Sequence, residues 1–174
     1  MKVFGSSGVR GVANQELGPA TAMRVASAAG TVFGAERVAV GRDPRLSGDM
    51  LAAAVASGLA STGADVLDVD VVPTPALQAF CERESVAGVM VTASHNPPEY
   101  NGIKLVGADG IELTSDRLER VEATMDGQPE RAAWDAVGGH TTVDGVVDDY
   151  VDAVVAAVDR RAIADADLTV AIDP

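Results

Sequence analysis

The sequence predicts an α/β fold, in which a mixed, mostly parallel sheet lies between two layers of helices as a three-layer α/β/α domain. Segments with an apolar period of two alternate along the chain with segments of period 3.6, which are the patterns of strands and of helices. This alternation implies right-handed crossovers between parallel strands. At 174 residues the chain has the length of one ordinary domain, or of one domain and part of a second.

Strands are expected where short runs rich in valine, isoleucine and leucine end at Gly, Pro or Asp. The segment 86–91 is apolar throughout, which is typical of a strand buried on both faces. Two short runs on either side of GADG (107–110) predict a hairpin that supplies an antiparallel edge. The stretch 128–145 has a weak pattern and is expected to be a loop or a weak edge strand. In chain order the expected strands are residues 2–4, 37–40, 65–71, 86–91, 103–106, 111–113 and 168–173.

Helices are expected where apolar residues recur every three or four positions between residues that start or end helices. Pro19 suits the first turn of one helix, and Ser47 suits the N-cap of the next. Gly63 and Gly127 each follow a helical pattern, where glycine commonly ends a helix. In chain order the expected helices are residues 19–33, 50–60, 73–81, 115–125 and 148–158.

The charge balance restricts the partners of the protein. The chain has 26 acidic residues against 13 basic ones, which gives a net charge of −13. Nucleic acids and anionic membranes both reward Lys and Arg, so neither is expected as a partner. Together with scarce lysine and only 3% aromatic residues, the acidity indicates a halophilic protein adapted to a salt-rich cytoplasm, because salt screens the self-repulsion.

The sequence contains no sign of export or of membrane insertion. Cys81 is the one cysteine, so no disulfide framework is expected. No amino-terminal stretch resembles a signal peptide, and no apolar run approaches the ~18 residues of a membrane span. We therefore expect a cytoplasmic protein.

Four loops are expected to meet at one edge of the sheet, because the carboxyl ends of parallel strands point the same way. Open α/β sheets bind ligands at this edge, which makes Arg10, Arg42, Ser94 and Lys104 candidate neighbours of a site. The four loops are GSSGVRG (5–11), GRDPR (41–45), PTP (73–75) and TASHNP (92–97).

Two of these loops allow more than one interpretation. GSSGVRG lacks the glycine spacing of dinucleotide-binding and P-loop fingerprints, and it is either a flexible turn or, through Arg10, a phosphate contact. In GRDPR, Asp43 is expected to pair with Arg42 or with Arg45 and to brace the loop.

The segment TASHNPPEYNGIK (92–104) carries the strongest indication of chemistry. Ser94 directly follows a buried strand, and Pro97 and Pro98 stiffen the loop that holds it. The chain has 11 arginines but only two lysines, so Lys104 stands out. A lysine amine can exchange a proton, whereas an arginine stays protonated, and Lys104 is therefore a candidate acid or base.

Ser94 is a candidate nucleophile for either of two kinds of chemistry. A serine hydrolase is disfavoured because no G-x-S-x-G elbow is present, and because the adjacent side chains of Ser94 and His95 should diverge in an extended segment. A serine that carries a phosphoryl group fits better, since it needs cationic groups and a metal ion rather than an oxyanion hole. The remaining alternative is a loop in which Ser94 and Asn96 make only local bonds to the backbone.

These motifs identify a resemblance. The chain is similar to the N-terminal part of the α-D-phosphohexomutases, the family of phosphoglucomutase, phosphomannomutase and phosphoglucosamine mutase. The resemblance covers nearly the whole chain, and TASHNP followed by NGIK is its most specific part. The matching segments are FGSSGVRG (4–11), GRDPRLSG (41–48), VPTPA (72–76), TASHNPPEYNGIKL (92–105) and LTVAIDP (168–174).

The resemblance implies a division of labour between residues of this chain. Ser94 is expected to carry the phosphoryl group, Lys104 to lie near the reacting hydroxyl, and Arg10 to lie near the transferred phosphate. His95, Asn96 and Ser7 are expected in the loops around the serine and the substrate phosphate. The implied reaction interconverts hexose 1-phosphate and hexose 6-phosphate through a hexose 1,6-bisphosphate.

The resemblance also implies partners that this chain does not contain. A Mg²⁺ ion is expected on the phosphate of Ser94, with its other ligands in a D-x-D-x-D-R loop of a second domain that is absent here. Four domains are expected in the complete enzyme, with residues 1–147 as domain I and residues 148–174 as a linker helix and the first strand of domain II. The chain would then be cut from a longer protein and inactive by itself.

The substrate is less well defined than the reaction. PPEYNGIK is similar to enzymes for glucose and mannose phosphates, which we favour, whereas GVRGVAN is similar to phosphoglucosamine mutases. A non-catalytic sugar-phosphate-binding protein with the same fold is a further alternative.

Overall fold

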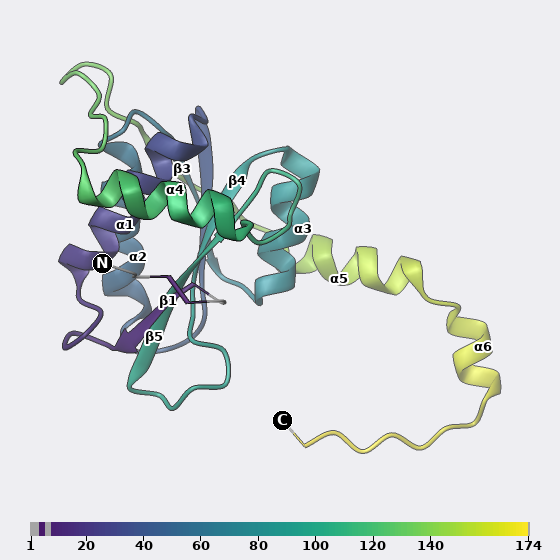
Figure 1. Cartoon of the computed structure of the whole chain (residues 1–174). Coiled ribbons are helices and arrows are strands. Elements are labelled where there is room, and N and C mark those ends of the chain that lie inside the picture. Colours follow the sequence, from purple (N-terminus) through teal and green to yellow (C-terminus); the bar gives the residue numbers. More distant parts are fainter. Residues whose placement is uncertain (1–3, 6–7, 174) are drawn as a thin grey trace.

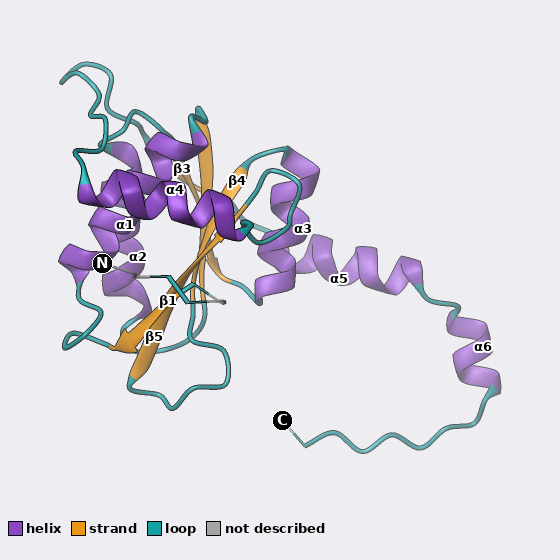
Figure 2. Cartoon of the chain, viewed as in Figure 1, coloured by secondary structure: helices purple, strands orange, loops and turns teal. Residues whose placement is uncertain are grey.

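A computed structural model of the chain describes residues 4–5 and 8–173, and within them it shows a six-stranded sheet (Figures 1 and 2). The strands are β1 (Val9–Val12), β2 (Arg37–Arg42), β3 (Asp65–Val71), β4 (Ala87–Val91), β5 (Tyr100–Val106) and β6 (His140–Thr142). Their order across the sheet is β1-β5-β4-β2-β3-β6. β2 pairs in parallel with β3 and β4, and β3 with β6, whereas β5 is antiparallel to both β1 and β4. The expected mixed, mostly parallel sheet is therefore confirmed.

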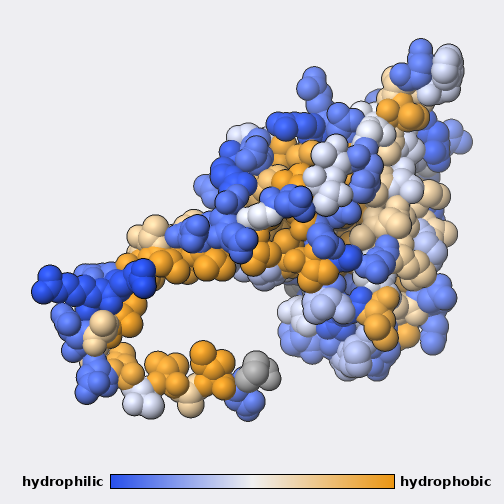
Figure 3. Space-filling view, turned by 180° about the vertical axis from the view of Figure 1, so that it is seen from behind, coloured by the Kyte–Doolittle hydropathy of each residue, from blue (hydrophilic) through white to orange (hydrophobic). Residues whose placement is uncertain are grey.

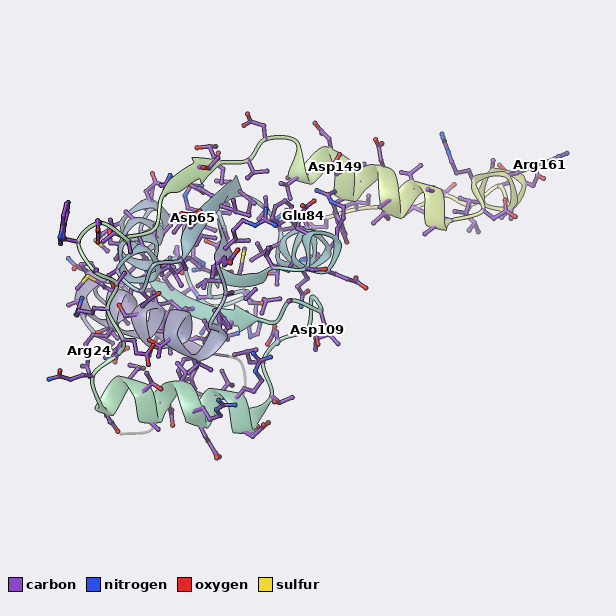
Figure 4. All side chains as sticks on the ribbon, turned by 90° about the horizontal axis from the view of Figure 1, so that it is seen from above. Arg24, Asp65, Glu84, Asp109, Asp149 and Arg161 are labelled. Carbon is purple, nitrogen blue, oxygen red and sulfur yellow. The ribbon has the colours of Figure 1, made fainter. Side chains whose placement is uncertain are left out.

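Helices cover both faces of this sheet. The helices are α1 (Pro19–Phe33), α2 (Gly48–Ala60), α3 (Thr74–Glu84), α4 (Ser115–Asp126), α5 (Val146–Ala157) and α6 (Arg160–Asp165). Val25 of α1 and Val121 of α4 belong to a buried apolar cluster on one face, and Leu77 of α3 belongs to a second cluster on the other. Figure 4, seen from above, places Arg24 of α1 and Glu84 of α3 on opposite sides of the sheet. The three-layer arrangement expected from the sequence is confirmed.

Small side chains allow the layers to pack closely. At Gly58 of α2, a Cβ atom would lie 2.5 Å from the carbonyl oxygen of Met23 in α1. The buried Ser27 of α1 donates a hydrogen bond of 3.1 Å to the Gly58 carbonyl, so the hydroxyl has a partner at this contact. The alanine-rich helices can therefore form a core although aromatic side chains are scarce.

One expectation for the first part of the chain is wrong, and a second is confirmed only in part. Arg10 lies in β1 rather than in a loop, because Val9–Val12 pairs along its whole length with β5. Ser47 is the N-cap residue of α2, as expected, but its hydroxyl makes no capping bond. The hydroxyl instead accepts a hydrogen bond of 2.9 Å from the buried Asn101 amide, which needs a partner inside the protein. The expected strand 2–4 lies mostly outside the described residues, and Phe4 belongs to no strand.

The hairpin after β5 is shorter than expected. Val106 pairs with Glu112 in an isolated antiparallel bridge around the turn at Gly107–Gly110, and residues 111–113 form no strand of their own. The weakly patterned stretch 128–145 contains the edge strand β6, which was one of the two expectations for it.

The carboxyl-terminal segment differs most from the expectation. Residues 168–173 form no strand, and α6 precedes them where none was expected. A strand requires a neighbour for its backbone N–H and C=O groups, and within the described residues none pairs with this segment. Leu168, Val170 and Ile172 remain 73 to 82% exposed, and Figure 3 shows apolar side chains along α5 and this segment. No described helix is long and apolar enough to cross a lipid bilayer.

Candidate active site

A cleft of ≈ 890 Å³ lies at the edge of the sheet where β2, β3 and β4 end. Arg45 lines it from the loop after β2, Pro73 from the loop after β3, and Ser94 from the loop after β4. The expectation that these three loops share an edge is confirmed. The segment 5–11 does not join them as a loop, because its last residues belong to β1.

Ser94 has an unusual backbone conformation at the mouth of this cleft. Its φ angle is 56°, in the left-handed region that residues other than glycine seldom adopt. Its N–H donates to the Thr92 hydroxyl over 3.1 Å, and its carbonyl oxygen accepts from Arg45 Nη2 over 2.8 Å. The side chain of Ser94 is exposed, so its hydroxyl is open to a ligand.

The relation between Ser94 and His95 corrects an expectation. The two side chains do not diverge, because the backbone at Ser94 is left-handed rather than extended. Ser94 Oγ lies 3.4 Å from His95 Nδ1, a long contact between two exposed side chains.

The two arginines of GRDPR make different ion pairs. Arg45 Nε donates to Asp43 Oδ2 over 3.0 Å, so Arg45 is the partner that braces the loop. Arg42 turns away to two other carboxylates, with distances of 2.7 Å to Asp49 and 2.7 Å to Asp70. Of the two pairings considered from the sequence, the structure shows the one between Asp43 and Arg45.

Arg10 reaches the Ser94 loop from β1. Its Nη1 donates to the Asn96 Oδ1 over 2.8 Å. The side chain passes over Gly102 of β5, where a Cβ atom would lie 3.1 Å from Arg10 Cγ and 2.6 Å from the carbonyl oxygen of Thr92. The glycine at position 102 therefore allows the backbone of Thr92 and the side chain of Arg10 to lie close against β5.

Lys104 lies in the middle of β5, opposite Met90 of β4. Its Nζ donates to Glu112 Oε1 over 2.7 Å, and its side chain is 15% exposed. Arg10 pairs with Gly102, two residues before Lys104, so alternation along the strand places Arg10 and Lys104 on the same face of the sheet. The structure records no bond from Lys104 to the Ser94 loop, and its role at a reacting hydroxyl stays a prediction.

The remaining candidates have simpler positions. His95 is exposed beside Ser94, and Asn96 accepts from both arginines, through its side chain from Arg10 and through its carbonyl from Arg45. Ser7 lies outside the described residues. In the described part of the chain, no three His, Cys, Asp or Glu side chains are grouped so that they could hold a metal ion.

Comparison with known protein families identifies the family of the chain. The family model described as phosphoglucomutase/phosphomannomutase, alpha/beta/alpha domain I, matches residues 1–132 of the chain. The chain belongs to this family.

Similar proteins include more than one kind of mutase. A phosphoglucomutase/phosphomannomutase of Thermococcus kodakarensis is 45% identical over 169 residues, covering 93% of this chain and 37% of that protein. A phosphoglucosamine mutase of Rhodococcus opacus is 43% identical over 169 residues, covering 92% and 38%. The crystal structure of a phosphoglucomutase/phosphomannomutase family protein from Burkholderia thailandensis has a TM-score of 0.77 and 32% identity, covering 90% of this chain and 36% of that one. The chain thus spans little more than a third of the length of these relatives.

Sequence reasoning missed three residues of this mutase-family domain. Thr92 and Glu112 were not singled out, and Arg45 was considered only as a partner of Asp43. Each of the three makes a contact that the local sequence pattern does not predict. Arg45, for example, bonds to carbonyls 49 to 55 residues further along the chain. The one signal in the sequence was the loop 94–99. Its two prolines have no N–H group, so the loop has few backbone donors of its own for its carbonyl groups.

Proposed function

We propose that this chain is the phosphoserine-bearing domain of a mutase that interconverts hexose 1-phosphate and hexose 6-phosphate. The observation that carries the proposal is the state of Ser94. Its peptide is held at both its N–H and its carbonyl, while its hydroxyl is exposed at a cleft on the ligand-binding edge of the sheet. A fixed backbone with an open hydroxyl suits a residue that carries a group into and out of a site.

The proposed reaction has two phosphoryl transfers at Ser94. In the first, the bond between Ser94 Oγ and phosphorus breaks while a hydroxyl oxygen of a hexose monophosphate bonds to that phosphorus, giving a hexose 1,6-bisphosphate. In the second, Ser94 Oγ takes the phosphoryl group from the other end of the bisphosphate, and the isomeric monophosphate leaves. In the first transfer the sugar hydroxyl loses one proton and Ser94 Oγ gains one, and in the second the Ser94 hydroxyl loses a proton to the sugar oxygen that is released. Lys104 would relay the proton between the two oxygens in each transfer. Arg10 would balance the charge of the phosphoryl group beside Asn96.

A Mg²⁺ ion is part of the proposal. The described residues offer no cluster of carboxylates for it, but the exposed Ser94 hydroxyl, once phosphorylated, supplies an oxygen ligand of the kind that Mg²⁺ prefers. Bound there, the ion would reduce the negative charge that opposes transfer of the phosphoryl group. Its other ligands would come from residues that this chain does not include.

The substrate we favour is a glucose or mannose phosphate, on the basis of PPEYNGIK and of the relative in Thermococcus kodakarensis. The relative in Rhodococcus opacus supports glucosamine phosphate as the alternative, at nearly the same identity. Turnover of glucose 1-phosphate, mannose 1-phosphate and glucosamine 1-phosphate by the complete polypeptide would rank the three. A cytoplasmic location, where sugar phosphates are made and used, belongs to the same proposal.

Intact-mass analysis tests the phosphoserine directly. After incubation with glucose 1,6-bisphosphate and Mg²⁺, the complete polypeptide should gain one phosphate, about 80 Da, and Ser94→Ala should gain none. Ser85→Ala is the matched control, because Ser85 is also exposed and also has a left-handed φ of 54°. Phosphate that maps to any residue other than Ser94 would contradict the proposal.

The 174-residue chain alone should not isomerise sugar phosphates. Phosphoryl transfer depends on positioning and on charge neutralisation, and here the expected metal carboxylates are absent from the described residues. A coupled assay with glucose 1-phosphate, its bisphosphate and Mg²⁺ should read background. Repeated turnover by the purified chain would mean that the site is complete within it.

A further inference from the structure

We propose that Arg45, acting with Asp43 and Thr92, is a positioning residue that holds Ser94 in the orientation needed for phosphoryl transfer. The inference rests on the proposed role of Ser94 as the phosphoryl carrier. Arg45 lines the cleft, and its charge alone would suggest that it binds a substrate phosphate. The role proposed for it is a different one.

The guanidinium of Arg45 is fully used inside the protein. A guanidinium has five N–H donors, and Arg45 makes one bond from Nε, two from Nη1 and two from Nη2. The Nε bond goes to Asp43, and the four others go to backbone carbonyls of the Ser94 loop at 2.7 to 3.0 Å. The four carbonyls are those of Ser94, Asn96, Pro97 and Tyr100. No donor is left for a substrate phosphate.

A closed ring of hydrogen bonds connects the N–H of Ser94 to the carbonyl oxygen of the same residue. The N–H of Ser94 donates to Thr92 Oγ1, and the Thr92 hydroxyl donates to Asp43 Oδ2 over 2.6 Å. The same Asp43 oxygen accepts from Arg45 Nε, and Arg45 Nη2 donates to the carbonyl of Ser94. Both polar groups that flank the Ser94 side chain are thus fixed by one network. The network is shielded from water, because Thr92 is 4% exposed and the Arg45 and Asp43 side chains are 12% and 17% exposed.

The ring explains how Ser94 keeps its left-handed backbone. A residue with a Cβ atom is disfavoured in this conformation, and such a conformation persists only where its surroundings impose it. The loop has little backbone pairing of its own to impose it, with bonds from Asn96 N to the Ala93 carbonyl and from Tyr100 N to the Pro97 carbonyl. Arg45 donates hydrogen bonds to four carbonyls of this loop and so fixes the direction in which the Ser94 hydroxyl points.

Arg45→Lys in the complete polypeptide is the first test. A lysine keeps the charge but has only three donors on one nitrogen, so it cannot hold four carbonyls and a carboxylate. We expect kcat for glucose 1-phosphate to fall about 10²-fold, because displacement of a reacting atom by about 1 Å has an effect of this size. The KM should stay within about twofold, because Arg45 does not touch the substrate. Hydrogen exchange of peptides that cover residues 92–101 should become faster.

Two comparisons separate positioning from general loss of structure. Arg83→Lys is the matched control, since Arg83 is also an ion-paired arginine but contacts Glu84 and Asp149 rather than the loop. It should leave kcat and exchange in residues 92–101 unchanged. If Arg45→Lys does not fold, Thr92→Val and Thr92→Ser give the same test, because only the serine keeps the hydroxyl that joins Ser94 to Asp43. Thr92→Val should lose at least about tenfold in kcat, and Thr92→Ser should recover most of it.

The outcomes that would overturn the inference are distinct from failure of the proposed function. If wild-type Ser94 carries phosphate and Arg45→Lys retains its kcat, the positioning role is wrong and the proposed function stands. A large rise in KM with unchanged kcat would instead make Arg45 a substrate ligand. If wild-type Ser94 carries no phosphate, the proposed function fails, and the role given to Arg45 fails with it.

Discussion

The ammonium of Lys104 and the carboxylate of Glu112 form an ion pair of 2.7 Å between β5 and the turn that follows it. The side chain of Lys104 is 15% exposed and that of Glu112 is 39% exposed. The pair holds the ammonium on the face of the sheet that also carries Arg10. An arginine could form the same ion pair, but it could not exchange a proton at neutral pH.

Lys104→Arg should therefore lose much more activity than stability. General acid–base catalysis typically contributes about 10²–10⁴ in rate, or roughly 3–5 kcal/mol of barrier, and this contribution should disappear. Because the pair with Glu112 can be kept and is partly exposed, the free energy of unfolding should change by less than about 1 kcal/mol. Steady-state turnover of the complete polypeptide and its denaturant unfolding measure the two effects. Near-normal turnover of Lys104→Arg would show that Lys104 serves only as a charge.

The regular elements could be predicted well where the apolar period and the boundary residues agree. The bounds expected for α1 and β3 are those observed, because Pro19 and Gly34 flank the first and the valine-rich run DVLDVDV makes up the second. The common edge of the loops after β2, β3 and β4 followed from parallel strands alone. The position of Ser94 at this edge of the sheet could therefore be predicted from the sequence.

Contacts between distant segments could not be predicted in the same way. The periodicity of 168–173 indicated a strand, but a strand exists only where a neighbour pairs with it. The left-handed φ of Ser94 depends on Arg45, whose bonds cross about 50 residues of sequence. The sequence indicated a loop at Arg10 because glycines flank it, but pairing with β5 makes Arg10 part of the strand β1. In each case tertiary contacts override the local pattern.

The Cys81 thiol should be inert in the folded protein. Burial raises the pKa of the Cys81 thiol from 9.0 to about 12, so the reactive thiolate is scarce near neutral pH. An aromatic disulfide reagent at about pH 8 should label native protein only as fast as it unfolds, and denatured protein at once. Rapid labelling of the native state would contradict the burial of Cys81.

The same shift predicts how stability depends on pH. Between pH 9.0 and about 12 the unfolded chain loses the Cys81 proton while the folded chain keeps it, so the free energy of unfolding falls as the pH rises. Other groups also titrate in this range, and Cys81→Ala isolates the contribution of the thiol. Wild-type protein should lose more stability than Cys81→Ala between about pH 8 and about pH 10.5.

The net charge of −13 predicts stabilisation by salt. The melting temperature should rise as KCl increases from about 0.05 M to about 2 M, because the Debye length shrinks from above 10 Å to a few ångströms. Asp148 and Asp152 are exposed four residues apart on α5, where like charges repel by roughly 0.2–0.5 kcal/mol. Asp148 lies in the first turn of α5, where the helix dipole favours a carboxylate, whereas Asp152 lies beyond that turn. Asp152→Asn should therefore stabilise the chain in low salt and have less effect in high salt. A melting temperature that falls with KCl would contradict the halophilic interpretation.

Ser94→Gly should be more stable than Ser94→Ala, although neither can carry a phosphate. At a φ of 56° an alanine bears about 1–2 kcal/mol of steric strain that a glycine avoids, and the greater freedom of glycine in the unfolded chain offsets roughly 0.5–1 kcal/mol of this gain. The net difference should be about 0.5–1 kcal/mol in favour of glycine, measured by denaturant unfolding. The adjacent residue gives the control, since Ala93 has no positive φ and Ala93→Gly should destabilise the chain. If Ser94→Ala equals or exceeds Ser94→Gly in stability, Ser94 is not left-handed in solution, and the ring through Arg45 cannot be its cause. If glycine is the more stable, the strained serine is retained for its hydroxyl, as expected of a residue that carries the reacting group.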